Sequence, residues 1–231
     1  MTATTATTRT LFVWRHGQTE HNAGNIWQGH LDTHLSEVGR AQATAAAAAL
    51  SVQAPTVIWS SDLARAADTA AALARLVRLP VRYDDRLREI HVGQWQGLSA
   101  GDVAERYPQV QAALAAGEDV RRGVDGETLA EVASRVRDCT EQLLAELPDR
   151  GCAVVVTHGV SGRALVASLV GLPQSTAWNV LAGLANCGWA RLVEDPDSST
   201  WRITHWNAGA PAQAPGRVAP GTVAPGTVAP G

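Results

Sequence analysis

Two apolar segments of the chain each end in a histidine followed by a glycine, and this repeated arrangement is the strongest constraint on its fold. They are residues 11–14, which lead into Arg15-His16-Gly17, and residues 153–157, which lead into His158-Gly159. Short apolar runs that end at a glycine turn are typical of buried parallel strands. In open α/β sheets, ligands bind just beyond the carboxyl ends of such strands. The sequence therefore predicts that both histidines lie at one ligand site.

Arg15, His16 and Gly17 have the properties of a phosphate site that contains a nucleophile. An arginine side chain offers a planar fork of donors that matches phosphate oxygens, and a neutral imidazole can attack phosphorus. Gly17 has no side chain where the backbone must approach a ligand. In a surface turn the same tripeptide would be only a solvated loop, so this interpretation depends on further segments.

Two further segments supply charged groups to the same edge of the predicted sheet. One predicted strand leads into a helix start, with Ser61 or Asp62 as the cap and Arg65 in about the first turn. A guanidinium there would join helix N–H groups that face an anion. Glu89 follows the short strand at 81–83 and could place a carboxylate at the same edge.

Together these segments belong to a set of motifs that spans about residues 10–207. The motifs are Arg15-His16-Gly17-Gln18-Thr19 with Asn22, Gln28-Gly29, Ser60-Ser61-Asp62-Leu63 with Arg65, Leu87-Arg88-Glu89, Gly93 with Trp95-Gln96-Gly97, and Thr157-His158-Gly159. In this combination the chain resembles the histidine phosphatase superfamily, in its phosphoglycerate mutase-like branch. The resemblance implies phosphoryl transfer through a phosphohistidine.

Carried over residue by residue, the resemblance also implies individual roles. His16 becomes the phosphohistidine, and Glu89 is the proton donor and acceptor. The expected phosphoryl and substrate ligands are Arg15, Asn22, Gln28, Arg65, His158 and Gly159. Trp95 is added as a substrate-binding residue, because Trp27 and Trp95 fall beside matched motifs and an aromatic face can stack on a sugar. Packing in the core is the alternative for both tryptophans.

The expected roles agree with the physical properties of the residues. A phosphoryl group in transit carries charge on three oxygens, so positioned cations can supply much of the catalysis. The guanidiniums of Arg15 and Arg65 should also keep His16 neutral, which its attack on phosphorus requires. Glu89 must carry a proton when the ester bond breaks, because the leaving alkoxide has to be protonated.

The chain contains no lysine, since all nineteen basic residues are arginine. The mutases that it resembles keep a lysine- and tyrosine-bearing stretch after the acidic residue, whereas residues 90–98 here follow the shorter phosphatase-like pattern. Within the phosphatase-like members, residues 28–33, 93–98 and 201–208 resemble the actinobacterial enzymes that act on glucosyl-3-phosphoglycerate. The alternatives are a broad-specificity or α-ribazole-type phosphatase, a phosphoglycerate mutase, and a non-catalytic regulator that binds phosphorylated ligands.

Composition restricts the partners that we expect. The net charge of −3 provides no basic patch for nucleic acid, and no apolar run approaches the roughly 18 residues of a membrane span. Residues 1–8 lack the regions of a signal peptide, so a cytoplasmic location is expected. We expect no cofactor and no metal, since His30 and His34 lack further ligands. The sequence leaves the oligomeric state open, a homodimer included, and predicts a small phosphate ester as the partner.

Alternating periodicities predict an α/β fold with a doubly wound, mostly parallel sheet, helices on both faces and an antiparallel edge. The expected strands lie at about 10–14, 56–60, 81–83, 153–157, 186–193 and 201–206, and the expected helices at 36–50, 62–77, 127–147 and 162–170. Residues 99–126 are predicted to cap the pocket and set its specificity. The predicted domain is 10–207, with disordered segments at 1–9 and, rich in proline and glycine, at 208–231.

Overall fold

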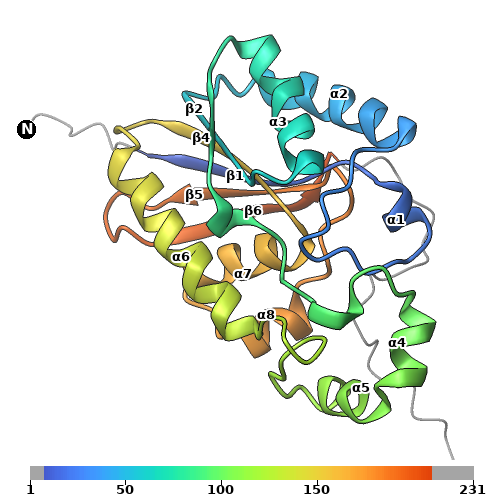
Figure 1. The fold of residues 1–231 in the computed structure, drawn as a ribbon. Helices are drawn as coiled ribbons and strands as arrows, with labels where there is room; N and C mark the ends of the chain where they lie inside the picture. Colours follow the sequence, from blue (N-terminus) through green and yellow to red (C-terminus); the bar gives the residue numbers. More distant parts are fainter. Residues whose placement is uncertain (1–7, 210–231) are drawn as a thin grey trace, which may run out of the picture.

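A computed structural model describes residues 8–209, and within them the chain forms one six-stranded sheet with helices on both sides (Figure 1). The strands are β1 (Thr10–Arg15), β2 (Val57–Ser60), β3 (Val81–Tyr83), β4 (Cys152–Thr157), β5 (Trp189–Glu194) and β6 (Trp201–Ala208). They are ordered β3-β2-β4-β1-β5-β6 across the sheet. Strands β3, β2, β4 and β1 are parallel, while β5 pairs antiparallel with both β1 and β6. The predicted fold class is therefore confirmed.

The centre of the sheet places the two His-Gly segments side by side. Strand β1 pairs in parallel with β4, and Arg15 lies opposite Thr157 in the register. The chain therefore leaves both strands at the same edge, with His16 and His158 as the next residues. A backbone hydrogen bond from His16 N–H to the Thr157 carbonyl, 3.0 Å long, extends the pairing by one step.

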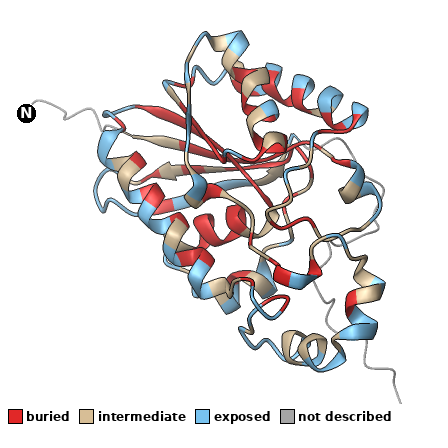
Figure 2. Cartoon of the chain, in the orientation of Figure 1, coloured by how far each residue is buried: buried red, intermediate tan, exposed pale blue. Residues whose placement is uncertain are grey.

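Alternate residues of the central strands pack on opposite faces of the sheet, as the two-residue period of a strand requires. Leu11 and Val13 join the core beneath α6 (Leu129–Glu146) and α7 (Gly159–Leu169). Their neighbours in β1 join a second core beneath α2 (Glu37–Ser51) and α3 (Ala64–Val77). Figure 2 shows that the sheet between these helix pairs is mostly buried. Apolar burial on both faces fixes the position of the strand ends.

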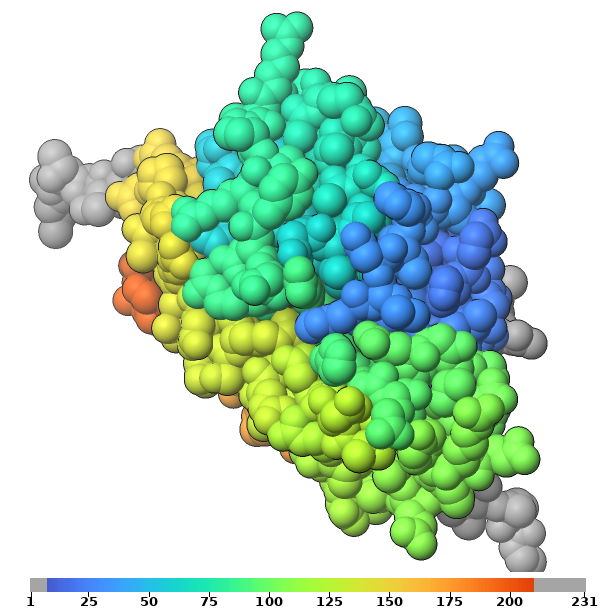
Figure 3. All heavy atoms as spheres, viewed as in Figure 1, coloured from blue at the N-terminus to red at the C-terminus, as the bar shows by residue number. Residues whose placement is uncertain are grey.

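Residues 99–126 differ from the prediction of a pocket cap. They contain α4 (Ala100–Arg106), which Ser99 caps, and α5 (Pro108–Ala115), and neither helix was predicted. These helices form a lobe beside the segment around residue 26, as the space-filling view shows (Figure 3). Ile26 bridges to Ser99, and the Trp27 N–H donates to the Leu98 carbonyl over 2.9 Å. The lobe therefore supports the pocket wall from behind, and none of its residues lines the pocket.

The described structure extends slightly beyond both predicted domain limits. Arg9, expected in the disordered start, donates to the Glu194 carboxylate at 2.6 and 2.5 Å and to the Leu144 carbonyl. Ala208, expected in the tail, belongs to β6. The rest of the predicted disordered segments, residues 1–7 and 210–231, lies outside the described residues. No helix within residues 8–209 is long and apolar enough to cross a membrane.

Candidate active site

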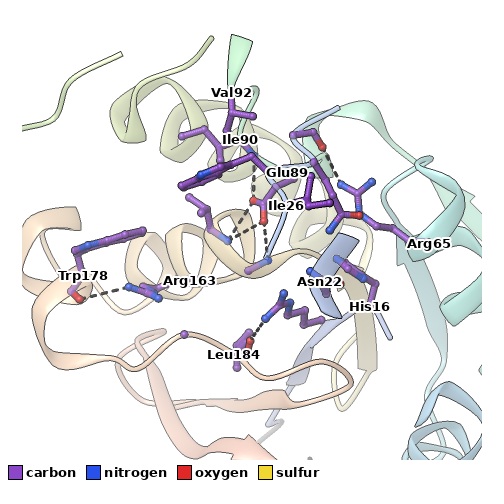
Figure 4. A pocket seen from close by; sticks show the side chains of 17 residues that line it. His16, Asn22, Ile26, Arg65, Glu89, Ile90, Val92, Arg163, Trp178 and Leu184 are labelled. Carbon is purple, nitrogen blue, oxygen red and sulfur yellow. Dashed lines mark hydrogen bonds between the residues drawn. The ribbon is translucent and has the colours of Figure 1, made fainter. Parts of the chain in front are cut away.

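A pocket opens at the carboxyl ends of β1 and β4, beside the loop that follows β3. It is lined largely by the residues that the sequence singled out (Figure 4). Its lining includes six of the predicted site residues: Arg15, His16, Asn22, Gln28, Arg65 and Glu89. Gly159, also predicted, lines it through the start of α7. Apolar walls are formed by Ile26, Trp27, Ile90, Val92, Val160 and Leu184. His158 lies directly behind this lining.

His16 is buried, and its ring is oriented by its own backbone neighbourhood. Its side chain is 2% exposed, and Nδ1 lies 2.7 Å from the Gly17 carbonyl oxygen. Because a carbonyl can only accept, Nδ1 carries the hydrogen and Nε2 is left with its lone pair. Burial, together with the charges of Arg65 and Arg15, holds the pKa of His16 well below its usual 6.5. The prediction of a neutral imidazole therefore agrees with the electrostatics of the site.

Two buried guanidiniums face this imidazole. Arg15 donates from Nη1 to the Leu184 carbonyl over 2.6 Å, and Arg65 donates to the carbonyls of Leu31 and Gly29, both over 2.8 Å. The Nε atoms of both arginines are buried without a hydrogen-bond partner among the described residues. Burial lowers the pKa of Arg65 to about 10, so this side chain remains charged at neutral pH, and burial also lowers the pKa of Arg15. Unpaired donors of this kind are suited to binding an anion.

His158 lies against His16, with the ring centroids 5.0 Å apart and the planes inclined by 61°. It is fully buried, and Nε2 lies 2.9 Å from the Ser61 hydroxyl. Its Nδ1 has no partner among the described residues. Burial and the nearby Arg65 charge lower the pKa of His158 well below 6.5. The site therefore holds two neutral imidazoles beside two guanidiniums.

The carboxylate of Glu89 sits on the N-terminus of α7. The backbone N–H groups of Gly159, Val160 and Ser161 donate to it over 3.0, 3.1 and 3.2 Å. A fourth N–H, from the residue after Glu89, donates over 2.9 Å. A helix N-terminus favours a bound anion, and here that anion is a side chain of the protein. Gly159 was predicted to bind phosphate, but its N–H is occupied by Glu89 instead.

The backbone of Glu89 is fixed by side chains that sequence reasoning did not assign to the site. Its carbonyl accepts hydrogen bonds from His30 Nε2, over 2.7 Å, and from Arg135, over 3.0 Å. Arg135 also pairs with Glu127 at 2.7 and 2.9 Å. His30 is thus bonded to the backbone beside the pocket.

Asn22 and Gln28 are held in place by the hydroxyl side chains of two threonines. The Asn22 side chain completes a capping box with Thr19 at the start of α1 (Glu20–Ala23). The amide oxygen of Gln28 accepts from the hydroxyls of Thr19 and Thr33 over 2.9 and 2.5 Å. With its oxygen so engaged, Gln28 is left with its amide nitrogen as a donor. Both residues line the pocket as predicted.

The prediction that Trp95 contacts substrate is wrong, because Trp95 is completely buried and does not line the pocket. Its ring lies between Trp27 and Tyr107, with centroid distances of 5.4 and 5.8 Å. Trp27 does line the pocket. The sequence signal was correct in placing an aromatic wall here, but proximity to a motif could not tell which ring faces the ligand. Trp95 supports Trp27 from behind.

Sequence reasoning missed two residues that line the pocket, an arginine and a tryptophan. Arg163 lies on α7, four residues after Gly159, and Trp178 lies on α8 (Gln174–Val180). Residues four apart share one face of a helix, so the spacing from Gly159 was a usable signal for Arg163. No local signal marks Trp178, since its position depends on how α8 packs against α7.

No group of three or more potential metal ligands occurs within residues 8–209.

An open α/β sheet with a neutral imidazole between buried guanidiniums at its carboxyl edge has the features of a phosphoryl-transfer protein. Residues 11–209 match the histidine phosphatase superfamily (branch 1). The chain belongs to this superfamily, as its motifs predicted.

Comparison with individual proteins agrees with the family. The chain is 43% identical over 216 residues to glucosyl-3-phosphoglycerate phosphatase of Mycobacterium tuberculosis (strain CDC 1551 / Oshkosh), covering 87% of this chain and 96% of the relative. It is 31% identical over 196 residues to a probable phosphoglycerate mutase of Serratia proteamaculans (strain 568), covering 85% and 89%. A mycobacterial glucosyl-3-phosphoglycerate phosphatase solved with VO3 is similar at a TM-score of 0.80 and 41% identity, covering 87% of this chain and 99% of that one.

Proposed function

We propose that the protein hydrolyses the phosphate monoester of glucosyl-3-phosphoglycerate through a phosphohistidine at His16. The observation that carries this proposal is the His16 ring, whose Nδ1–H donates to Gly17 while burial and two arginines keep the imidazole neutral. This leaves the lone pair of Nε2 available for attack on phosphorus. The identity of 43% with a glucosyl-3-phosphoglycerate phosphatase supports the choice of substrate.

The reaction proceeds in two steps in this proposal. His16 Nε2 forms a bond to phosphorus while the ester oxygen leaves with a proton from Glu89. Arg15, Arg65 and His158 hold the phosphoryl oxygens during this step, because the charge of the transition state is spread over these three oxygens. In the second step a water molecule attacks the phosphohistidine, Glu89 takes the proton from that water, and inorganic phosphate is released. His16 is restored and no group is consumed.

The acid–base role of Glu89 depends on a change of partners. In this structure, four backbone N–H groups donate to its carboxylate. To protonate an ester oxygen, the side chain must carry a proton on one oxygen while the other keeps helix contacts.

A phosphoglycerate mutase is the second candidate, favoured by the 31% identity with a probable phosphoglycerate mutase. A mutase must return the phosphoryl group to another hydroxyl before water reaches it. The two functions differ in their products. A phosphatase releases inorganic phosphate, whereas a mutase interconverts 2- and 3-phosphoglycerate.

A phosphate-release screen tests the proposal. It compares glucosyl-3-phosphoglycerate, 3-phosphoglycerate, phosphosugars, nucleotides and α-ribazole phosphate, with EDTA present throughout. We expect the highest kcat/KM for glucosyl-3-phosphoglycerate, and full activity in EDTA because arginines supply the positive charge at the site. A preference for nucleotide or α-ribazole phosphate would contradict the substrate assignment. Interconversion of phosphoglycerates without phosphate release would instead establish a mutase. The cytoplasmic location stays a prediction.

A further inference from the structure

Arg163 is a buried cation in the pocket that the proposed chemistry at phosphorus does not use. Its side chain is 4% exposed, and it forms no ion pair with any carboxylate of residues 8–209. Its hydrogen bond to the Trp178 carbonyl is long, at 3.4 Å. Nε is buried without any partner in the described structure. Burying a guanidinium with so few partners is costly unless a ligand supplies an anion.

The surroundings of Arg163 hold its guanidinium in one place. The guanidinium carbon lies 4.2 Å from the centre of the Trp178 ring, which is a cation–π contact. On another side lies Gly183, where an added Cβ would stand 3.1 Å from Arg163 Nη2. A side chain at position 183 would therefore crowd the guanidinium. Burial lowers the pKa of Arg163 to about 10, which leaves it charged at neutral pH.

Arg163 and the groups at phosphorus lie at different ends of the pocket. Figure 4 shows Arg65 and His16 on one side of Glu89, and Arg163 with Trp178 on the other. Along α7, Arg163 is one helical turn beyond Gly159, which is a rise of about 6 Å. A ligand that reaches both ends must therefore carry a second anionic group a short distance from its phosphate.

The charges that line the pocket require such a group. Among the lining residues, Arg15, Arg65 and Arg163 are positive and Glu89 alone is acidic. When Glu89 carries the proton needed by the leaving group, three positive charges face the substrate. A phosphate dianion neutralises two of them. One guanidinium remains, and a single carboxylate would neutralise it with bidentate geometry.

We propose that Arg163, stacked on Trp178, binds the carboxylate of the substrate and so selects phosphate esters that bear a carboxylate near the ester oxygen. In a 3-phosphoglycerate unit, two carbons and the ester oxygen separate the carboxyl carbon from phosphorus, so the carboxylate and the phosphate are two distinct anionic groups held close together on one ligand. This inference rests on the proposed function only for the identity of the glycosylated substrate. The recognition of a carboxylate by Arg163 does not depend on that function.

The test compares paired substrates that differ only in the carboxylate. One pair is glucosyl-3-phosphoglycerate and its analogue with a hydroxymethyl group in place of the carboxylate; the other is 3-phosphoglycerate and glycerol 3-phosphate. Arg163→Met keeps an unbranched apolar stem at this position and removes the guanidinium and its charge. We expect kcat/KM for the carboxylated member of each pair to fall about 100-fold, chiefly through KM, and for its partner less than about 5-fold. The matched control Arg137→Gln, an exposed arginine on α6, should leave all four values unchanged.

Equal losses for both members of a pair, or no loss for either, would overturn the carboxylate assignment. A second measurement on the unaltered enzyme covers the case in which Arg163→Met does not fold. Glucosylglycerate should inhibit hydrolysis of p-nitrophenyl phosphate at least about 10-fold more strongly than glucosylglycerol, which lacks the carboxylate, and equal inhibition would also overturn the assignment. If glucosyl-3-phosphoglycerate is not hydrolysed but 3-phosphoglycerate loses its advantage over glycerol 3-phosphate in Arg163→Met, the proposed substrate fails while the carboxylate site stands.

Discussion

The Glu89 carboxylate lies 3.0 Å from the backbone nitrogen of Gly159, so the proposed acid and the second His-Gly segment are in direct contact. A Cβ at position 159 would lie 3.6 Å from Glu89 Oε2 and 3.7 Å from the Arg15 guanidinium carbon, which are ordinary contact distances, so it is the backbone N–H of this position that the contact uses. The start of α7 therefore orients the carboxylate, while His158, one residue earlier, contacts His16. One strand end positions groups for both steps of the proposed reaction.

Glu89→Gln tests the proton transfer. The variant keeps an acceptor for the helix N–H groups but cannot donate a carboxylic proton. The loss of activity should therefore depend on whether the leaving group needs a proton. We expect activity on glucosyl-3-phosphoglycerate to fall about 10²- to 10⁴-fold, and activity on p-nitrophenyl phosphate far less, because its leaving group needs no proton. Steady-state kinetics on both substrates checks this. Equal losses would show that Glu89 acts only by holding α7 in place.

Arg65→Ala tests the contribution of one guanidinium at phosphorus. Removing a preorganised charged donor should cost about 2–4 kcal/mol of transition-state stabilisation, measured from kcat/KM with p-nitrophenyl phosphate. Arg75→Ala, an exposed arginine on the same helix, is the control and should leave kcat/KM unchanged. A loss of less than tenfold in Arg65→Ala would contradict the assignment of Arg65 to the phosphoryl group.

Trp27 and Trp95 should respond differently to truncation. Trp27→Ala removes a pocket wall, so KM for glucosyl-3-phosphoglycerate should rise roughly tenfold while p-nitrophenyl phosphate is less affected. Trp95→Ala removes a fully buried ring and should lower the free energy of unfolding by about 3–5 kcal/mol. Kinetics and urea unfolding of both variants check this. The reverse pattern would mean that Trp95 and not Trp27 meets the sugar.

The two neutral histidines make stability depend on pH. Burial and Arg65 hold the pKa values of His16 and His158 well below 6.5 in the folded protein, whereas both return to about 6.5 on unfolding. Below pH 6.5 the unfolded chain therefore takes up protons that the folded chain excludes, and the free energy of unfolding falls. Each histidine should contribute up to about 1.4 kcal/mol per pH unit in this range.

Urea unfolding between pH 7.5 and 5.5 measures this slope. His158→Gln should reduce the slope of unfolding free energy against pH by the contribution of one histidine. His205→Gln, which changes an exposed histidine, is the control and should leave the slope unchanged. An unchanged slope in His158→Gln would show that His158 gains its proton in the folded protein too.

The sequence was sufficient to predict the sheet and most of the charged residues that line the pocket, because both depend on local patterns. Apolar runs defined β1 and β4, and the residues directly after them had to meet at one sheet edge. Tertiary contacts decided the features that were missed. The helix α3 begins at Ala64 without a cap from Ser61 or Asp62, since its Ala64 N–H is bound by Asp32 from another loop, over 2.7 Å.

The substrate side of the pocket was less predictable for the same reason. Trp178 reaches the pocket through the packing of α8 against α7, and no pattern around residue 178 indicates that contact. The segment 99–126 looked like an irregular cap because of its proline and glycines. Pro108 instead begins α5, a position where proline is well tolerated. The described pocket is lined by residues closer to the motifs than this segment.

Trapping the covalent intermediate tests the central claim most directly. The enzyme is mixed with substrate carrying a labelled phosphoryl group and quenched within one turnover. We predict a phosphoenzyme that survives alkali, is lost in acid and maps to His16, and we predict that His16→Ala abolishes both the label and turnover. Label that is lost in alkali, or turnover that persists in His16→Ala, would contradict a phosphohistidine at this position.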